Sequence, residues 1–199
     1  MSILLAKEIK QFYKEGLIKI EPFNEDNLAV NSIDVTLSSK LITYEPIDII
    51  WSEKYQSYIV QKISNDLTIL DMKGNNKTYE IIIPASGLIL IPGILYLGST
   101  VEKAGSEYFI PMYEGRSSMA RLGVQSHISA GFGDIGFQSN WTLEITVVHP
   151  LKFYPNIRIG QVYFHRIENS ISKEDLYSGK YLNQVEATAS QSFKDFKDL

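Results

Sequence analysis

Short apolar runs separated by glycine, proline and asparagine limit most strongly how this chain can fold. Runs of this kind are typical of all-β barrels and sandwiches, whereas amphipathic helices need longer stretches with a 3.6-residue period. We therefore predict a mainly β fold, a distorted barrel or jelly roll. The predicted strands cover residues 17–20, 32–37, 41–44, 81–84, 87–91, 95–101, 108–113, 124–128, 141–148, 151–154 and 161–167.

Four segments depart from this pattern. We expect a short amphipathic helix from Ile3 to Tyr13, because apolar residues recur on one helical face there and Gly16 follows as a stop. Residues 46–79 are less regular and are predicted to form hairpins or an excursion rather than a second domain. A short helix or turn is expected at 117–122. The polar tail from about residue 170 is expected to be mobile, which leaves 1–199 as a single domain.

Composition argues against several classes of function. The formal net charge of −4 indicates no broad electrostatic binding to nucleic acid or to anionic membranes. Without cysteine, the chain can form no disulfide and cannot build the cysteine-ligated zinc site of many deaminases. The three histidines, His127, His149 and His165, lack metal-ligand spacing, so we predict no metal held by the protein.

Targeting signals are also missing from the sequence pattern. The N-terminal residues contain no apolar run followed by a small-residue cleavage site. The most apolar stretch, residues 80–97, is interrupted by two prolines and two glycines, so it does not read as a membrane span. We expect a cytoplasmic protein.

Residues 115–123, Gly-Arg-Ser-Ser-Met-Ala-Arg-Leu-Gly, bring two guanidiniums and two hydroxyls together. A guanidinium binds phosphate bidentately and stays charged at any working pH. Glu144 lies between apolar residues of a predicted strand, where burial can tune a carboxylate to act as a general base. Singly, these residues also fit a helix cap, a surface ion pair and a solvent-facing glutamate. Together they suggest that water is activated beside a bound polyphosphate.

The 115–123 segment resembles the signature of the dCTP deaminase branch of the trimeric dUTPase-like superfamily. Other segments match in the same order, and the matches span almost the whole chain. The resemblance implies a dUTPase-like β-barrel assembled as a homotrimer, with each site shared between neighbouring subunits. The further matching segments are 32–37, 130–137, 142–144, 158–161 and 179–184.

The resemblance also implies a metal-free hydrolytic deamination of dCTP. Glu144 would take a proton from the water that attacks C4 of cytosine, and Ser117 and Arg121 would hold and polarise the water and the base. Arg116 and Ser118 would contact the phosphates. Mg²⁺ would arrive bound to the triphosphate, and no zinc would be needed.

Further matching residues would complete the nucleotide site. Asp134 would contact the 3′-hydroxyl and orient the water that attacks the α-phosphate, and Phe137 would pack against the sugar. Their plainer interpretations are a turn aspartate and a core aromatic. Three tail residues would close over the nucleotide, if the tail is not simply a disordered terminus. The tail residues are Tyr177, Lys180 and Gln184, and the remaining predicted contacts are Ala130, Thr142, Leu143 and Gln161.

Members of this superfamily differ in their product. Glu144 and the Arg-Ser-Ser-x-x-Arg form favour a deaminating member, and Gly131 with Phe132 resembles the bifunctional branch that continues to dUMP and diphosphate. We therefore predict a dUMP-forming dCTP deaminase that supplies dUMP and keeps dUTP low, in a family where dTTP feedback is common. Three alternatives stay open: a deaminase that releases dUTP, a dUTPase alone, and a non-catalytic nucleotide-binding module.

Two residues near the predicted hydrolytic site differ from the family pattern. Gly133 stands where an apolar residue is usual, which predicts a looser loop. Ile135 stands where proline is common. Both differences bear on the second reaction, at the phosphate, more than on the deamination.

Overall fold

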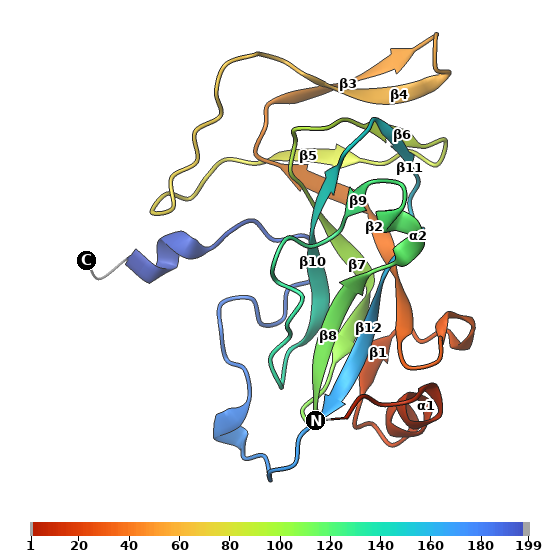
Figure 1. The fold of residues 1–199 in the computed structure, drawn as a ribbon. Helices are drawn as coiled ribbons and strands as arrows, with labels where there is room; N and C mark the ends of the chain where they lie inside the picture. The colour runs from red at the N-terminus through yellow and green to blue at the C-terminus, as the bar shows by residue number, and fades with distance from the viewer. Residues whose placement is uncertain (1, 197–199) are drawn as a thin grey trace.

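The computed structural model describes residues 2–196, and its main feature is one large sheet that is nearly closed into a barrel (Figure 1). Its strands are β1 (Lys19–Glu21), β2 (Ile33–Thr43), β5 (Tyr79–Ile82), β7 (Tyr96–Gly105), β8 (Phe109–Gly115), β9 (Val124–Gln125), β10 (Gln138–Val147) and β12 (Arg158–Arg166). The strand order is β8-β12-β2-β7-β10-β9, while β1 pairs with β7 and β5 pairs with β2. The prediction of a mainly β, barrel-like fold is confirmed.

A smaller sheet extends the molecule beyond one end of the barrel (Figure 1). Its strands, in the order β11-β6-β4-β3, are β3 (Ile47–Ser52), β4 (Ser57–Lys62), β6 (Leu88–Leu90) and β11 (Leu151–Phe153). The β3–β4 hairpin and the loop that returns to β5 make up the irregular segment at 46–79. The helical elements are α1 (Ala6–Lys14), η1 (Glu25–Asn27), α2 (Ser117–Ala120), η2 (Lys173–Asp175) and η3 (Ser192–Phe196).

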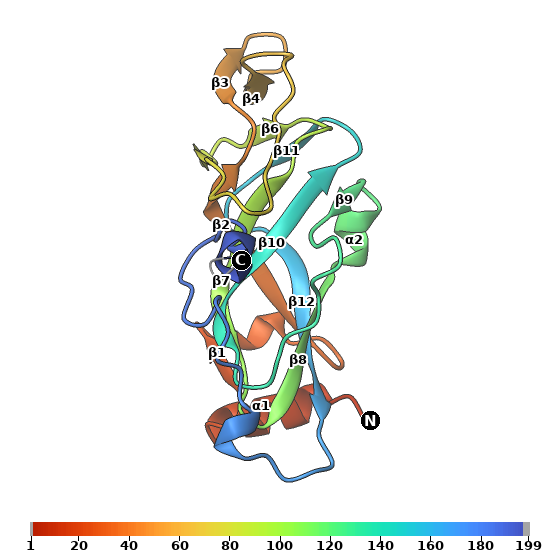
Figure 2. The same cartoon turned by 90° about the vertical axis from the view of Figure 1, so that its left-hand side faces the viewer.

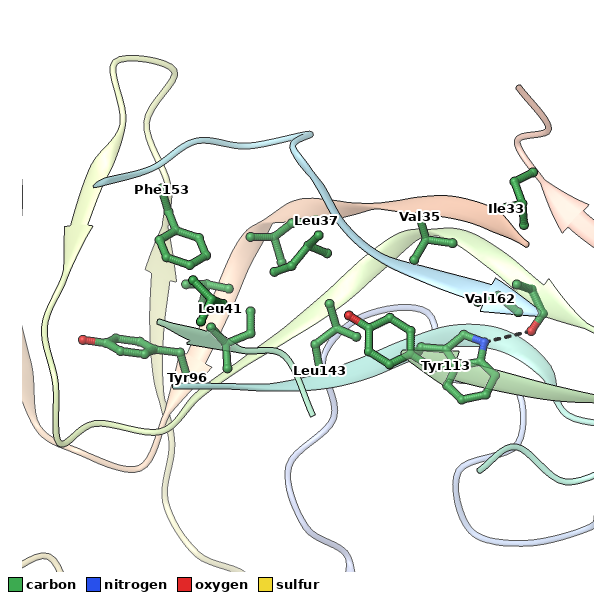
Figure 3. Packing of buried hydrophobic residues seen from close by; sticks show 14 of the residues in the cluster. Ile33, Val35, Leu37, Leu41, Tyr96, Tyr113, Leu143, Phe153 and Val162 are labelled. Carbon is green, nitrogen blue, oxygen red and sulfur yellow. Dashed lines mark hydrogen bonds between the residues drawn. The ribbon is translucent and has the colours of Figure 1, made fainter. Parts of the chain in front are cut away.

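The core fills the barrel and follows from the two-residue alternation of its strands. On β2, Ile33, Val35 and Leu37 all point inward and are almost fully buried (Figure 3). Each such side chain contributes about 1.5–3 kcal/mol by leaving water. Tyr113 of β8 is also buried, and its hydroxyl hydrogen-bonds Ser126 Oγ at 2.8 Å. Burial raises the pKa of Tyr113, so this hydroxyl stays a neutral hydrogen-bonding group.

Some boundaries differ from the sequence prediction. The two strands expected at 32–37 and 41–44 are one long strand, β2, whose pairing with β7 shifts register between Leu37 and Leu41. A bulge of this kind bends the strand, so that one long strand can follow the curvature of the barrel. The helix α1 begins at Ala6 instead of Ile3, because Leu4 N donates to Phe164 O at 3.0 Å and keeps the first residues extended.

The tail after β12 runs back along the barrel beside β10 (Figures 1 and 2). Its backbone is hydrogen-bonded to the barrel at Tyr177 N with Ile135 O (2.8 Å) and at Ser190 N with the Tyr44 hydroxyl (2.8 Å). These bonds hold two separated parts of the tail against the same side of the sheet. Among residues 2–196, no helix combines the length and apolar character that would cross a bilayer.

Candidate active site

A cavity of about 540 Å³ lies between β10, the loop at 130–137 and the tail. Strand alternation explains how β10 contributes, because Thr142 and Glu144 line the cavity. Leu143, between them, points into the core (Figure 3). The predicted site residues that line it are Ala130, Phe132, Asp134, Phe137, Thr142, Glu144, Tyr177 and Gln184. One chain therefore gathers eight of these predicted residues around one space.

Glu144 is partly buried at the wall of this cavity. The backbone N–H of Ile128 donates to its Oε2 at 3.0 Å. Within residues 2–196 its Oε1 accepts no hydrogen bond, so this oxygen is free for a water molecule. The strand predicted at 124–128 ends at Gln125, since the chain turns there and brings Ile128 to the carboxylate.

The loop at 130–137 is packed closely against β8. Gly131 O accepts from Tyr113 N at 2.7 Å, and a Cβ on Gly131 would lie 2.6 Å from Tyr113 O. Gly133 N donates to Pro111 O at 3.0 Å, and a Cβ there would lie 2.5 Å from the Trp141 ring. The expectation that Gly133 loosens this loop was wrong, because only glycine fits between these atoms.

The same loop positions Asp134 and Phe137. Phe137 N donates to Asp134 O at 3.1 Å, and Gly136 between them takes a positive φ of 89°. This tight turn exposes the Asp134 side chain at the cavity. The Phe137 ring meets Trp141 edge-on at 5.3 Å and Tyr177 at 6.0 Å between centroids. An apolar wall thus stands beside an acidic group.

Residues of the tail line part of the cavity and are hydrogen-bonded to β10. Gln184 Nε2 donates to Asn140 O at 2.6 Å, and Thr188 N donates to Thr142 Oγ1 at 3.1 Å. Tyr177 lines the cavity, whereas Lys180 forms an ion pair with Asp195 and is not among the lining residues.

The sequence analysis missed one wall of the cavity. This wall comes from the loop between β4 and β5, from residues at the start of β7, from Tyr44 after β2, and from the tail. Ser192 Oγ donates to Met72 O at 2.7 Å and so joins the tail to the loop between β4 and β5. Apart from Tyr181, which falls in the matching segment 179–184, no motif marks these residues, because only the fold brings them to the cavity. They are Tyr44, Leu70, Asp71, Met72, Asn76, Leu95, Leu97, Tyr181, Thr188, Ser190 and Ser192.

The other predicted residues lie elsewhere in the chain. Arg116, Ser117, Ser118 and Arg121 are on and beside α2, and none of them lines the cavity. The helix α2 and the tail lie on either side of β10 (Figures 1 and 2). Gln161 lies in a smaller hollow, where its Oε1 accepts from Ser32 Oγ at 3.1 Å. A single chain therefore keeps the carboxylates and the cationic signature apart.

We call these two regions the cavity face and the arginine face. The cavity face consists of the residues that line the 540 Å³ cavity. The arginine face consists of residues 116–121 together with Asp34 and Arg158, which ion pairs connect to Arg116. Among the residues described, no group of three or more His, Asp or Glu side chains is arranged to hold a metal ion.

Comparison with known proteins identifies the family. The model of the dCTP deaminase-like family matches residues 3–167. The chain belongs to this family. A dCTP deaminase-like protein from Hathewaya histolytica, named "dCTP deaminase, dUMP-forming", is 44% identical over 195 residues, covering 98% of this chain and 99% of its own. Proteins with the same name from Clostridium botulinum (strain Alaska E43 / Type E3) and Cytophaga hutchinsonii are 44% and 39% identical, each with 98% of this chain and 99% of theirs covered.

A solved structure supports the dCTP deaminase-like fold. The crystal structure of 2′-deoxycytidine 5′-triphosphate deaminase from Agrobacterium tumefaciens superimposes with a TM-score of 0.59 over 86% of this chain, at 16% identity. The match covers 50% of that protein, so this chain spans half its length. At this identity the likeness concerns the fold.

Proposed function

We infer that this chain deaminates dCTP and hydrolyses the triphosphate to give dUMP and diphosphate. Relatives that align over nearly their whole length carry the name "dCTP deaminase, dUMP-forming". The observation that carries the proposal is one cavity lined by Glu144, Asp134 and Phe137. Two carboxylates and an aromatic ring in one cavity suit two hydrolytic steps on one nucleotide.

In the first step, Glu144 acts as the general base. Its Oε1 takes a proton from water, and the resulting hydroxide attacks C4 of cytosine, while Ile128 N–H holds Oε2 and orients the carboxylate. The attack forms the C4–O bond and moves the electron pair of the C4–N3 double bond onto N3. Glu144 passes its proton to the departing nitrogen, the C4–N4 bond breaks, and the proton of the C4 hydroxyl moves to N3, so that dCTP and water give dUTP and ammonia. Ser117 and Arg121 hold the water and polarise the base.

In the second step, Asp134 orients the water that attacks the α-phosphorus. The bond between the α-phosphorus and its bridging oxygen breaks, and diphosphate leaves. Phe137 packs on the deoxyribose and has no polar atom to receive a 2′-hydroxyl. The glycines at 131 and 133 allow the loop to lie close to Trp141 and β8, which fixes the position of Asp134 in the cavity.

The complete site needs both faces, and we propose that a homotrimer supplies them. The arginine face of one subunit would cover the cavity of its neighbour, so that Arg116, Ser117, Ser118 and Arg121 meet the nucleotide held there. The separation of the two faces within one chain supports this arrangement. Closed rotational symmetry would then give three equivalent sites.

Mg²⁺ would be bound chiefly by the triphosphate oxygens, which supply most of its ligands and neutralise their charge. The carboxylate chemistry of Asp134 fits contact with such an ion through water. The chain lacks cysteine, so we propose that deamination proceeds without zinc. We also propose that dTTP acts as a feedback inhibitor and that the protein works in the cytoplasm without nucleic-acid or membrane partners.

A product assay tests the function. The protein is incubated with dCTP and Mg²⁺, and the nucleotides are separated. Formation of dUMP with diphosphate and ammonia is expected, and activity should survive a zinc chelator that leaves Mg²⁺ in place. Accumulation of dUTP alone would identify a plain deaminase. Hydrolysis of added dUTP without turnover of dCTP would identify a dUTPase, and no turnover of either would leave a binding module.

A further inference from the structure

Three polar residues, Ser32 directly before β2 and Asp34 and Thr36 on it, are bonded to side chains of neighbouring elements. Ser32 Oγ donates to Gln161 Oε1, Asp34 meets two arginines, and Thr36 donates through N (2.8 Å) and Oγ1 (2.9 Å) to Glu102. Ser32, Asp34 and Glu102 are buried although they lie outside the barrel core. Of the two buried carboxylates, only Asp34 is paired with guanidiniums.

Asp34 lies behind both guanidiniums of the arginine face. Its Oδ2 is 3.2 Å from Arg116 Nε and 3.4 Å from Arg158 Nη1. The Asp34 side chain is 10% exposed, whereas the side chains of Arg116 and Arg158 are 29% and 48% exposed. The carboxylate is therefore shielded from a ligand, while both guanidiniums keep edges that a ligand can reach.

Backbone hydrogen bonds fix the main chain of each arginine, so Asp34 needs to order only the two side chains. Arg116 N donates to Ile159 O at 3.2 Å, and Arg158 pairs with Thr36 in the sheet. Arg116 Nη1 also approaches Arg158 O at 3.5 Å. Because Arg116 uses its Nε toward Asp34, its terminal Nη2 stays available for a phosphate oxygen.

We propose that Asp34 is a positioning residue that holds Arg116 and Arg158 as a paired polyphosphate-binding site, and that Arg158 is a further phosphate-contacting residue. Two guanidiniums and one carboxylate leave a net positive charge at the surface. An ordered arginine loses less side-chain entropy when it binds, so the pair binds phosphate more tightly than two free side chains would. The proposal rests on the proposed function, because it takes the substrate's triphosphate as the ligand.

When Asp34 loses its charge, a positioning role and a purely electrostatic effect predict opposite changes in the affinity for phosphate. Removing a negative charge beside a polyanion site strengthens or preserves phosphate binding if Asp34 only stabilises the fold. Removing it weakens phosphate binding if Asp34 orders the arginines. The direction of the change therefore separates the two roles.

The test compares Asp34→Asn with Glu102→Gln, a buried carboxylate bonded to the same strand but to no arginine. For Asp34→Asn we expect KM for dCTP to rise roughly tenfold, with a much smaller change in kcat. Binding of inorganic triphosphate, measured by calorimetry, should weaken by a similar factor. Glu102→Gln should lower the melting temperature while both binding measurements stay at the wild-type level.

Arg158→Gln provides the second variant, because its side chain is half-exposed and its loss leaves the core intact. It should also weaken triphosphate binding, and its effect should not add to that of Asp34→Asn. Unchanged or tighter triphosphate binding in either variant would overturn the proposal. The calorimetry needs no turnover, so a failure of the proposed reaction would be seen separately, in wild-type protein that binds triphosphate without consuming dCTP.

Discussion

The cavity face and the arginine face are built in contrasting ways. Around the cavity, segments far apart in sequence, among them the loop between β4 and β5, residues 130–144 and the tail, surround Glu144 and Asp134 together with aromatic rings. On the arginine face, Ser117, Ser118 and Arg121 are exposed, and the side chain of Arg116 is held by an ion pair with Asp34 and a hydrogen bond to Arg158 O. Under the proposed function, this difference means that one chain by itself forms the part of the site for the base and the sugar, whereas the phosphate-binding residues come from a neighbouring subunit.

This contrast has a physical basis. A general base gains from partial removal of water, because hydrogen bonds and charge interactions are stronger where bulk water is excluded. A guanidinium stays charged in any environment and can bind phosphate at an open surface. Enclosure is therefore needed on the cavity face and not on the arginine face.

The largest effect is expected from Glu144→Gln. This change keeps the shape of the cavity wall but removes the base, so kcat for deamination should fall by roughly 10²–10⁴ while dCTP binding changes little. Ammonia release and calorimetry measure the two quantities. Glu114→Gln is the control, since that glutamate is exposed on β8 and does not line the cavity. Loss of binding in Glu144→Gln would make Glu144 structural.

Asp134→Asn tests whether the two carboxylates of the cavity face have separate roles. Deamination should continue, because Glu144 is intact, whereas dUMP formation should fall by about 10² or more and dUTP should accumulate. Chromatography of the nucleotides over time follows both products. Equal loss of dUTP and dUMP would contradict separate roles for the two carboxylates.

Mixing two inactive variants tests whether the two faces come from different subunits. Ser117→Ala and Glu144→Gln proteins are unfolded and refolded together at equal amounts. In a trimer whose sites combine one subunit's cavity with its neighbour's arginine face, about a quarter of the sites regain both wild-type faces. The same proteins refolded separately serve as controls. Activity that stays at the level of the separate variants would mean that each site is complete within one chain.

Gly133→Ala tests the close packing of the loop on the cavity face. The added Cβ would lie 2.8 Å from Pro111 O, a backbone atom that cannot move alone, so stability should fall by about 1–3 kcal/mol. Denaturant unfolding measures the change in the free energy of unfolding. Ser118→Ala on the exposed arginine face should leave this free energy unchanged. An unaltered stability for Gly133→Ala would show that the loop can yield.

The smallest effect concerns the anchor of the tail. Lys40 pairs with Glu80 (2.8 Å) and Glu186 (3.0 Å), and hydrogen bonds to these two carboxylates raise its pKa above the ordinary 10.5. A raised pKa means that this stabilisation is fully present below pH 10.5 and is lost as the pH rises through the folded value. Limited proteolysis of the tail should therefore accelerate at high pH, and Lys40→Met should accelerate it already at pH 8. Equal cleavage rates for both proteins at pH 8 would remove Lys40 from the anchor.

Local sequence patterns predicted much of the fold. Alternating residues such as Ile33, Val35 and Leu37 predicted both a strand and its buried side, because side-chain direction in a strand depends on parity alone. The join of two predicted strands into β2 was not predictable, since the bulge that permits it depends on pairing with β7. The role of Gly133 was misjudged for a similar reason, because its neighbours Trp141 and Pro111 are distant in sequence.

By itself, the sequence determined the β class, the order of the motifs and the chemistry of Glu144, Asp134 and the arginines, since residue type and spacing specify these. The tertiary structure decided which of those groups meet. It put Asp134, Phe137 and Glu144 around one cavity and left Arg116 with Asp34 on another face. It also brought Met72 and Ser192 together as a wall that no motif marks. Such contacts join residues far apart in the chain, and only the closed path of the barrel sets the distances between them.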